Sequence, residues 1–332
     1  MNLQEFWASI TTIINNLFGR CNKLPDVPAG GNSNPVQRKV LVITFNPTIP
    51  SEGGQKLIDV MRWNNPMNLI SGYLGDIRTA SSEYASYIVV EQLEVDQFPT
   101  KEDKFVYNPD NYLANIRSGS GFHEPDTADY YAILKKFDIV NKVNSGSIDE
   151  IWLLGFPNAG FYESRMVGPK AFWCNAPPII DHPDCQRTFV IMGFSYERGI
   201  GEMLESFSHR VEFILQQQFR NVLPSDNLWQ RFTRYEKANT GKAEVGTVHY
   251  APNSQTDYDW GNKTHVLSFC NNWYHFPDLS GGAVNVNCTE WGNGDIRAHH
   301  NWWLRHLPHI IGRRNSISYN WWEYVIDPAK VN

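Results

Sequence analysis

The pattern of apolar and polar residues between Arg187 and Arg220 predicts a buried strand that leads into a long amphipathic helix. The run Thr188–Phe194 is apolar and contains several β-branched residues, which is typical of a strand covered on both faces. A polar turn at 195–199 follows, and apolar residues then recur at the spacing of one helix face. The residues of this face are Met203, Leu204, Phe207, Val211, Ile214 and Leu215.

The other side of the same helix carries a stripe of three carboxylates and an imidazole, about 80° wide. Its members, at positions i, i+3, i+7 and i+10, are Glu202, Glu205, His209 and Glu212. Such groups can bind a divalent metal or carry out acid–base catalysis, although a solvated charged face is the commoner use of such a stripe. We expect Glu205 and His209 to be metal ligands, with zinc or calcium as the ion. Glu212 is expected to take the least part, because it lies about 15 Å along the helix from the site edge.

Alternating strands and helices between residues 38 and 222 predict an α/β domain with a mostly parallel sheet and flanking helices. The predicted strands are Val40–Phe45, Tyr84–Val95, Ile148–Phe156 and Thr188–Phe194. The predicted helices between them run from Glu52 to Trp63 and from Asp126 to Phe137. In such sheets ligands bind beyond the carboxyl ends of the strands, and this rule selects the loops 46–52, 157–165 and 195–202.

Two of these loops carry charged residues that could form a site beside the start of the long helix. Glu163, Glu197 and Glu202 are the candidate catalytic residues, since positioned carboxylates can transfer protons. Arg165 and Arg198 are candidate binding residues. Charges gathered in this way are energetically costly without a functional use.

The composition changes after residue 222. Eight of the twelve Trp and seven of the ten His lie between Asn221 and Asn332. We therefore divide the chain into an N-terminal helix (1–20), a linker (21–37), an α/β domain (38–222) and an irregular Trp/His-rich segment (223–332) that covers the site edge. His123, His299 and His300 are candidate binding residues that could complete a metal site, although a single His is more often structural.

Four of the five cysteines form two locally spaced pairs in loop-like sequence. We expect disulfides between Cys174 and Cys185 and between Cys270 and Cys288, which would indicate an oxidising compartment. Four buried thiols are the alternative. Neither pair has the spacing of a structural zinc site.

Several functional classes lack support in the sequence. The net charge of −6 and the lack of a Lys/Arg run argue against nucleic-acid binding. Neither dinucleotide-binding nor ATP-binding glycine motifs are present, and the GxSxG and HExxH signatures of hydrolases are missing. No apolar run approaches the roughly 20 residues of a transmembrane helix.

The N-terminal segment bears on where the protein is located and how it reaches that place. Residues 3–18 have the periodicity of an amphipathic helix, which could dock on its own domain, lie on a membrane, or bind a partner as a packaging peptide. The segment contains Glu5 and lacks the basic region and cleavage site of a Sec signal peptide. We therefore expect export by a route without such a signal, with a cytoplasmic location as the alternative.

One stretch, IDEIWLLGFPNAGFYESRMVGPKAFWCNAPP at 148–178, resembles a family of uncharacterised bacterial and fungal proteins. Tyr196–Gly199, Gly201–Leu204 and the pair His209-Arg210 match further motifs of that family, and the resemblance covers most of residues 38–330. Many of its members are exported and joined to sugar-binding or adhesion modules. The resemblance implies an extracellular setting and names no reaction. This chain departs from the family at 1–35, where a recognisable secretion signal is replaced.

Together these features predict a hydrolase, with a metal assisting, that acts on an extracellular peptide or glycan. The substrate itself, small or polymeric, is not specified by the sequence. The alternative is a non-catalytic binding protein, or a packaged or exported cargo protein, whose charged helix face is structural.

Overall fold

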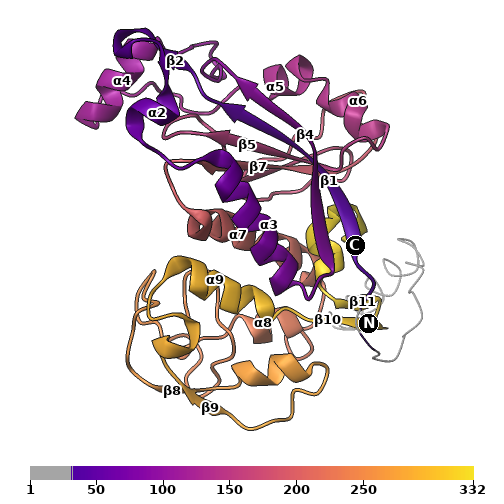
Figure 1. Ribbon diagram of the computed structural model, residues 1–332. Coiled ribbons are helices and arrows are strands. Elements are labelled where there is room, and N and C mark those ends of the chain that lie inside the picture. The colour runs from indigo at the N-terminus through magenta and orange to yellow at the C-terminus, as the bar shows by residue number, and fades with distance from the viewer. Residues whose placement is uncertain (1–30, 32) are drawn as a thin grey trace, which may run out of the picture.

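A five-stranded sheet organises the first two thirds of the chain (Figure 1). The computed structural model describes Gly31 and residues 33–332. The predicted helix at 3–18, for which a binding partner was one expectation, lies outside the described residues. The strand order is β4-β1-β5-β7-β6, in which the first four strands are parallel and β6 runs antiparallel to β7. The strands are β1 (Val36–Phe45), β4 (Ala85–Val95), β5 (Glu150–Gly155), β6 (Ser164–Val167) and β7 (Phe189–Ser195).

Helices flank this sheet, and the predicted α/β class with a mostly parallel sheet is confirmed. In Figure 1, α3 and α7 lie on one side of the sheet, and α5 and α6 lie on the other. The helices of this part are α2 (Leu57–Met61), α3 (Pro66–Ala80), α4 (Pro109–Ser118), α5 (Tyr130–Lys136), α6 (Ile139–Asn144) and α7 (Ile200–Phe219). No helix in the described part of the chain combines the length and apolarity needed to cross a membrane.

Both predicted helices have different bounds in the structure, and Asp126–Phe137 is shortened to α5 (Tyr130–Lys136). The range Glu52–Trp63 is broken into a 3-10 turn (Pro50–Glu52), a short hairpin of β2 (Thr48–Ile49) and β3 (Gln55–Lys56), and α2. Gly53 and Gly54 adopt positive φ there, which ends a helix. The following α3 was not predicted, although Asn65 caps its first turn and Pro66 occupies its first position.

A buried ion pair ties α7 to the centre of the sheet. Arg210 and Glu150 are 0% and 2% exposed, and Nη1 of Arg210 donates to Oε1 of Glu150 at 2.6 Å. The same carboxylate accepts from Nε1 of Trp152, and the hydroxyl of Tyr87 donates to its other oxygen. These bonds compensate the cost of burying both charges, so this face of α7 is structural.

The Trp/His-rich segment has short elements and long connections, as predicted. Figure 1 shows α9 beneath α3 and α7, and the close approach of α9 to α7 requires Gly201, because a Cβ there would lie 2.4 Å from Ile296. The elements are α8 (Leu228–Phe232), β8 (Val266–Ser268), β9 (Val284–Val286), α9 (Ile296–Arg305), β10 (His309–Arg314), β11 (Ile317–Asn320), α10 (Trp322–Ile326) and 3-10 turns at Cys270–His275, Cys288–Trp291 and Pro328–Lys330.

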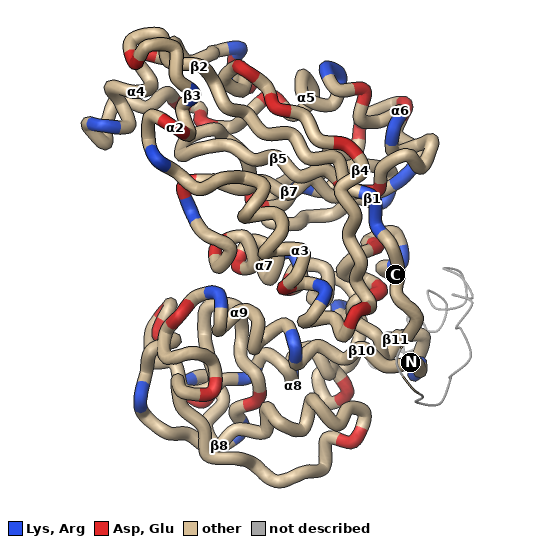
Figure 2. Tube along the Cα trace, in the orientation of Figure 1, with Lys and Arg blue, Asp and Glu red and all other residues tan. Residues whose placement is uncertain are grey.

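Tryptophans supply much of the core of this segment. Trp303 and Trp321 are at most 1% exposed and pack with Phe232 at ring distances of 5.5 and 5.8 Å. The chain end then returns to the long helix, where Trp322 stacks on Phe207 at 6.1 Å. Figure 2 shows Lys and Arg interspersed with Asp and Glu along the described chain.

The predicted disulfides do not form, and the four described cysteines are free thiols. Cys174 is fully buried, with Sγ 3.3 Å from the hydroxyl of Ser164, and Cys185 instead bonds the carbonyl of Arg187. Cys270 and Cys288 each contact a nearby asparagine. Local spacing across loops was therefore a misleading signal, since it does not fix whether two side chains face each other.

Candidate metal centre

Three potential metal ligands meet between α7 and the loop that follows α8. Nε2 of His209 lies 3.0 Å from Nε2 of His249, and that atom lies 3.3 Å from Oε1 of Glu205. All three ligand atoms lie within 4.8 Å of one another. Glu205 and His209 are one turn apart on α7, whereas His249 comes from a separate part of the chain. Among the described residues this is the group of His, Cys, Asp and Glu with metal-like spacing.

A second carboxylate holds each imidazole from behind. Nδ1 of His209 lies 3.3 Å from Oε2 of Glu212, and Nδ1 of His249 lies 3.0 Å from Oδ1 of Asp257. A carboxylate only accepts, so each Nδ1 can donate its proton to the carboxylate behind it, and the two Nε2 atoms are the ones that a cation would bind. Carboxylates that orient ligating histidines in this way are characteristic of metal sites.

The charges of these groups stabilise one another. The pKa of His249 is raised by its bond to Glu205, and the pKa of His209 is raised by its Glu212 bond and nearby carboxylates, against the effect of burial. Burial opposes ionisation of Glu205, but the surrounding histidines lower its pKa below the ordinary value. The cluster therefore favours a negative Glu205 and a positive charge between the two imidazoles.

Local structure fixes these side chains. Gly199 is the N-cap of α7, and its N–H donates to Oε2 of Glu202 at 3.0 Å, which is one of the two bonds of a capping box. Glu212 is anchored twice, because its Oε1 also accepts from the backbone N–H of Val248 at 3.0 Å. This bond attaches the loop of His249 directly to α7. Glu212 is not among the three potential ligands, and it contacts the cluster from behind, through His209 and the loop of His249.

A cavity of about 240 Å³ opens beside the cluster, at the carboxyl ends of β5 and β7. Its walls come from the loops after these two strands and from the first turns of α7, as the sheet-edge rule predicts. Glu163 and Glu205 share this cavity. Glu163 accepts a hydrogen bond from the side-chain amide of Asn175, and burial raises its pKa.

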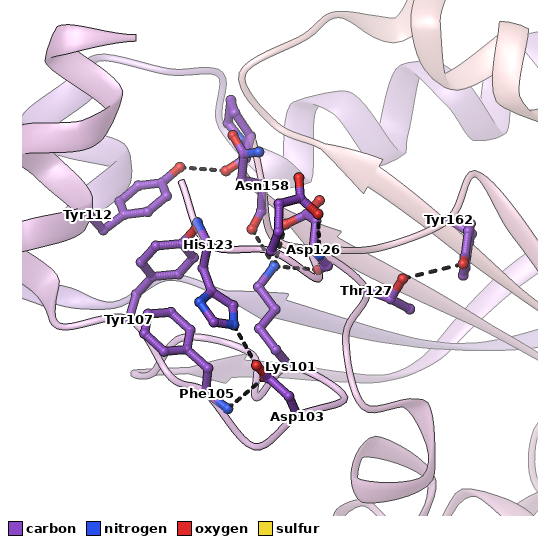
Figure 3. Close-up of polar contacts among 12 residues, drawn as sticks. Lys101, Asp103, Phe105, Tyr107, Tyr112, His123, Asp126, Thr127, Asn158 and Tyr162 are labelled. Atoms are coloured by element: carbon purple, nitrogen blue, oxygen red, sulfur yellow. Dashed lines mark hydrogen bonds and ion pairs between the residues drawn. The ribbon is translucent and has the colours of Figure 1, made fainter. Parts of the chain in front are cut away.

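A buried lysine holds the outer wall of the cavity (Figure 3). Nζ of Lys101, which is 0% exposed, donates at 2.6 Å to the carbonyl of Asp126, to its carboxylate and to the carbonyl of Asn158. Gly160 follows with a φ of +85°, and a Cβ there would lie 2.0 Å from the carbonyl oxygen of Asp126. The ammonium is fully satisfied, so Lys101 positions the wall and does not act as a nucleophile.

Of the other residues predicted at the sheet edge, some line the cavity and some do not. Glu197, Arg198 and Glu202 line the cavity, and Glu197 and Arg198 are exposed at its rim with a loose ion pair of 3.8 Å. Arg165 is not among the lining residues, because its guanidinium lies over the ring of Tyr130 at 4.7 Å. The loop 46–52 likewise contributes no lining residue.

The three predicted binding histidines do not reach the cavity. His123 stacks on Phe105 at 3.8 Å and pairs with Asp103 at 2.7 Å, beside Lys101 (Figure 3). His299 and His300 are 0% exposed on α9, and burial lowers the pKa of His300 to about 4 and that of His299 well below its ordinary value. They pack behind the cluster, against Trp260.

His249, Asp257 and Tyr258 are not among the predicted site residues. His249 lies in an irregular segment where no periodicity distinguishes one His from another. The run Asp257-Tyr258-Asp259 was a visible signal, because a cluster of charges beside an aromatic residue in a loop is unusual. That Asp257 and Tyr258 both contact His249 became apparent only from the packing of this loop against α7.

Comparisons with protein-family models, with curated proteins and with solved structures return no match for this chain.

Proposed function

We propose that the protein is a metal-assisted hydrolase whose ion is held by Glu205, His209 and His249. The observation that carries this proposal is the approach of the two Nε2 atoms to 3.0 Å, with Oε1 of Glu205 at 3.3 Å from one of them. Two lone pairs facing each other at this distance repel unless a proton or a cation lies between them. Bonds of 2.0–2.1 Å in tetrahedral geometry separate ligand atoms by about 3.3 Å, which suits zinc.

The donor set supports a catalytic rather than a structural ion. Two imidazoles and one carboxylate leave a fourth position open, as in catalytic zinc sites, and calcium would require more oxygen ligands. The ion would polarise a substrate oxygen and make a bound water more acidic. Glu205 also lines the cavity, so a substrate there would lie beside the open position.

Glu163 is the best placed general base. It shares the cavity with Glu205, and its charge interacts with His209 and His249. Burial raises its pKa toward the range in which a carboxylate accepts a proton efficiently near neutral pH. Its Asn175 partner occupies one oxygen and leaves the other for water. Glu197 at the exposed rim and Glu202, which accepts from the N–H of Gly199, are less suited to proton transfer.

An extracellular peptide or glycan is the substrate that we propose. The support is the resemblance of 148–178 to mostly exported proteins, together with the aromatic-rich composition. An extracellular location, reached by a route without a Sec signal peptide, is part of the same proposal.

The direct test is zinc binding. Protein stripped with EDTA should bind one Zn²⁺ in competition with a chromophoric chelator. Loss of an outer carboxylate typically costs 10- to 100-fold in metal affinity, so Glu205→Gln and His249→Asn should cost more than about 100-fold. The matched control is His123→Asn, which removes an imidazole paired with a carboxylate outside the cluster. Unchanged affinity in His249→Asn, or no binding by the native protein, would overturn the metal site.

Catalysis requires a separate readout. Zinc-loaded protein should hydrolyse at least one of a labelled protein, a peptide panel or a peptidoglycan suspension, and EDTA should abolish the activity. Zinc binding without hydrolysis of any of these would favour the alternative, in which the protein is a non-catalytic binding or cargo protein.

A further inference from the structure

Tyr258 lies over the metal cluster and has no role in the ligand set. Its ring packs on the His249 imidazole at 4.3 Å and meets Trp260 edge-on at 5.2 Å. The same imidazole lies 3.3 Å from Oε1 of Glu205 through its Nε2 atom, so Tyr258 and Glu205 both contact His249. Tyr258 is nevertheless 51% exposed, so one side of the ring remains open to solvent. The Tyr258 ring is therefore held by packing on one side and is accessible to a ligand on the other.

The backbone at this position is held in an unfavourable conformation. Tyr258 has a φ of +58°, which is rare for a bulky residue and costs about 1 kcal/mol or more. The structure compensates through neighbouring bonds: the N–H of Tyr258 donates to the carbonyl of His249 at 3.2 Å, and Asp257 holds the His249 ring. Asp259 in turn accepts from Asn262 at 2.8 Å. Backbone strain kept in this way is concentrated at functional sites.

We infer that Tyr258 is a catalytic residue whose phenol donates a hydrogen bond to the oxyanion formed from an amide or ester carbonyl. This inference rests on the proposed function, because it places the substrate carbonyl at the open metal position. It goes beyond that function by naming the bond that is cleaved.

The chemistry of the site accounts for this substrate class. Water adds to the carbonyl carbon, its proton passes to Glu163, and the carbonyl π electrons move to the oxygen. Two electrophiles, the ion and the Tyr258 hydroxyl, would face that oxygen where negative charge develops. When the intermediate collapses, the C–N or C–O bond breaks and the leaving amine or alkoxide takes the proton from Glu163. Glycoside cleavage develops positive charge instead, which a metal and a phenol donor would not stabilise.

The experiment uses the Co²⁺-loaded protein and methylphosphonate, a tetrahedral oxyanion, as the probe. Visible absorption of Co²⁺ reports both metal affinity and probe binding. Tyr258→Phe should retain Co²⁺ affinity within about twofold, because no ligand is removed. Its affinity for methylphosphonate should fall about 10- to 100-fold, as expected for one hydrogen bond to a charged oxygen. The ring of Phe keeps the packing on His249, so the fold should be retained.

Tyr131→Phe is the matched control. Tyr131 is 47% exposed, close to the exposure of Tyr258, and its hydroxyl bonds the carboxylate of Asp181 outside the cluster. It should bind both Co²⁺ and methylphosphonate like the native protein.

The outcomes separate the two proposals. Absence of Co²⁺ binding by the native protein would refute the metal site itself. If Co²⁺ binds but the probe does not, or if Tyr258→Phe binds the probe like the native protein, the metal site stands and the role of Tyr258 is wrong. Cleavage of aryl glycosides but of no aryl ester or anilide would likewise overturn the substrate class.

Discussion

Nε2 of His209 and Nε2 of His249 lie 3.0 Å apart, although the two residues are 40 positions apart in the chain. One belongs to a regular helix and the other to an irregular loop. Carboxylates contact Nδ1 of both rings, so the two Nε2 atoms face each other, with Glu205 beside them. This contact joins the sheet layer to the Trp/His-rich segment at the point where the cavity opens. A cation bound there would therefore also link the two parts of the chain.

Glu163→Gln should separate catalysis from metal binding. The amide cannot accept the proton from water, so turnover should fall by about 100-fold or more. Zinc affinity should remain near that of the native protein, because Glu163 is not among the three ligands. Steady-state kinetics and the chelator competition assay measure the two effects. Glu197→Gln, at the exposed rim, is the control and should lower turnover by less than about threefold.

The same variant should also change stability in a pH-dependent way. Burial raises the pKa of Glu163 above its ordinary value of 4.5, so ionising it costs the folded state free energy. At a pH above the raised pKa, the metal-free Glu163→Gln protein should therefore melt at a higher temperature than the native protein. Below pH 4.5 this gain should vanish, because Glu163 is then protonated in both states. A melting temperature lowered equally at pH 4 and pH 8 would contradict this account.

Buried imidazoles should make the fold sensitive to acid. Burial lowers the pKa of His306, which is 0% exposed, to about 4 from an ordinary 6.5. Its stabilising contribution is complete above pH 6.5 and is lost as the pH falls toward 4, because only the unfolded chain gains the proton. The loss amounts to about 3 kcal/mol for this residue. His306→Phe should therefore flatten the fall in unfolding free energy between pH 6.5 and 4, as measured by urea denaturation. His275→Phe, at an exposed imidazole, controls for the loss of a histidine.

Substitutions on the opposite face of α7 should change the free energy of unfolding and leave metal binding unchanged. Glu150→Gln leaves the buried Arg210 without a counter-charge, which should lower the free energy of unfolding by about 3–5 kcal/mol. Asp76→Asn breaks the more exposed pair with Arg297, and it should cost no more than about 1 kcal/mol. Equal costs in urea unfolding would show that burial does not control these pairs. Replacing both members, as Glu150→Leu with Arg210→Met, should recover most of the stability.

The elements with strong periodicity were predictable. The strand before α7, the helix itself and the apolar strands of the sheet follow from local patterns, and so does the α/β class. Prediction failed where the signal was weak or non-local. β6 was missed because it is four residues long, and α3 was missed although Asn65 and Pro66 mark its start. Cysteine spacing did not predict contact, because side-chain direction depends on the packed backbone.

The sequence by itself determined that Glu205 and His209 lie on one helix face, because i and i+4 positions are adjacent in any α-helix. It also determined that the loops after β5 and β7 meet at one sheet edge. Only the tertiary structure decided that His249 completes the cluster, that Glu212 and Asp257 contact the rings from behind, and that His123, His299 and His300 do not line the cavity. Those contacts depend on how an irregular segment packs on α7, and that packing is set by buried tryptophans and backbone bonds that leave no periodic trace in the chain.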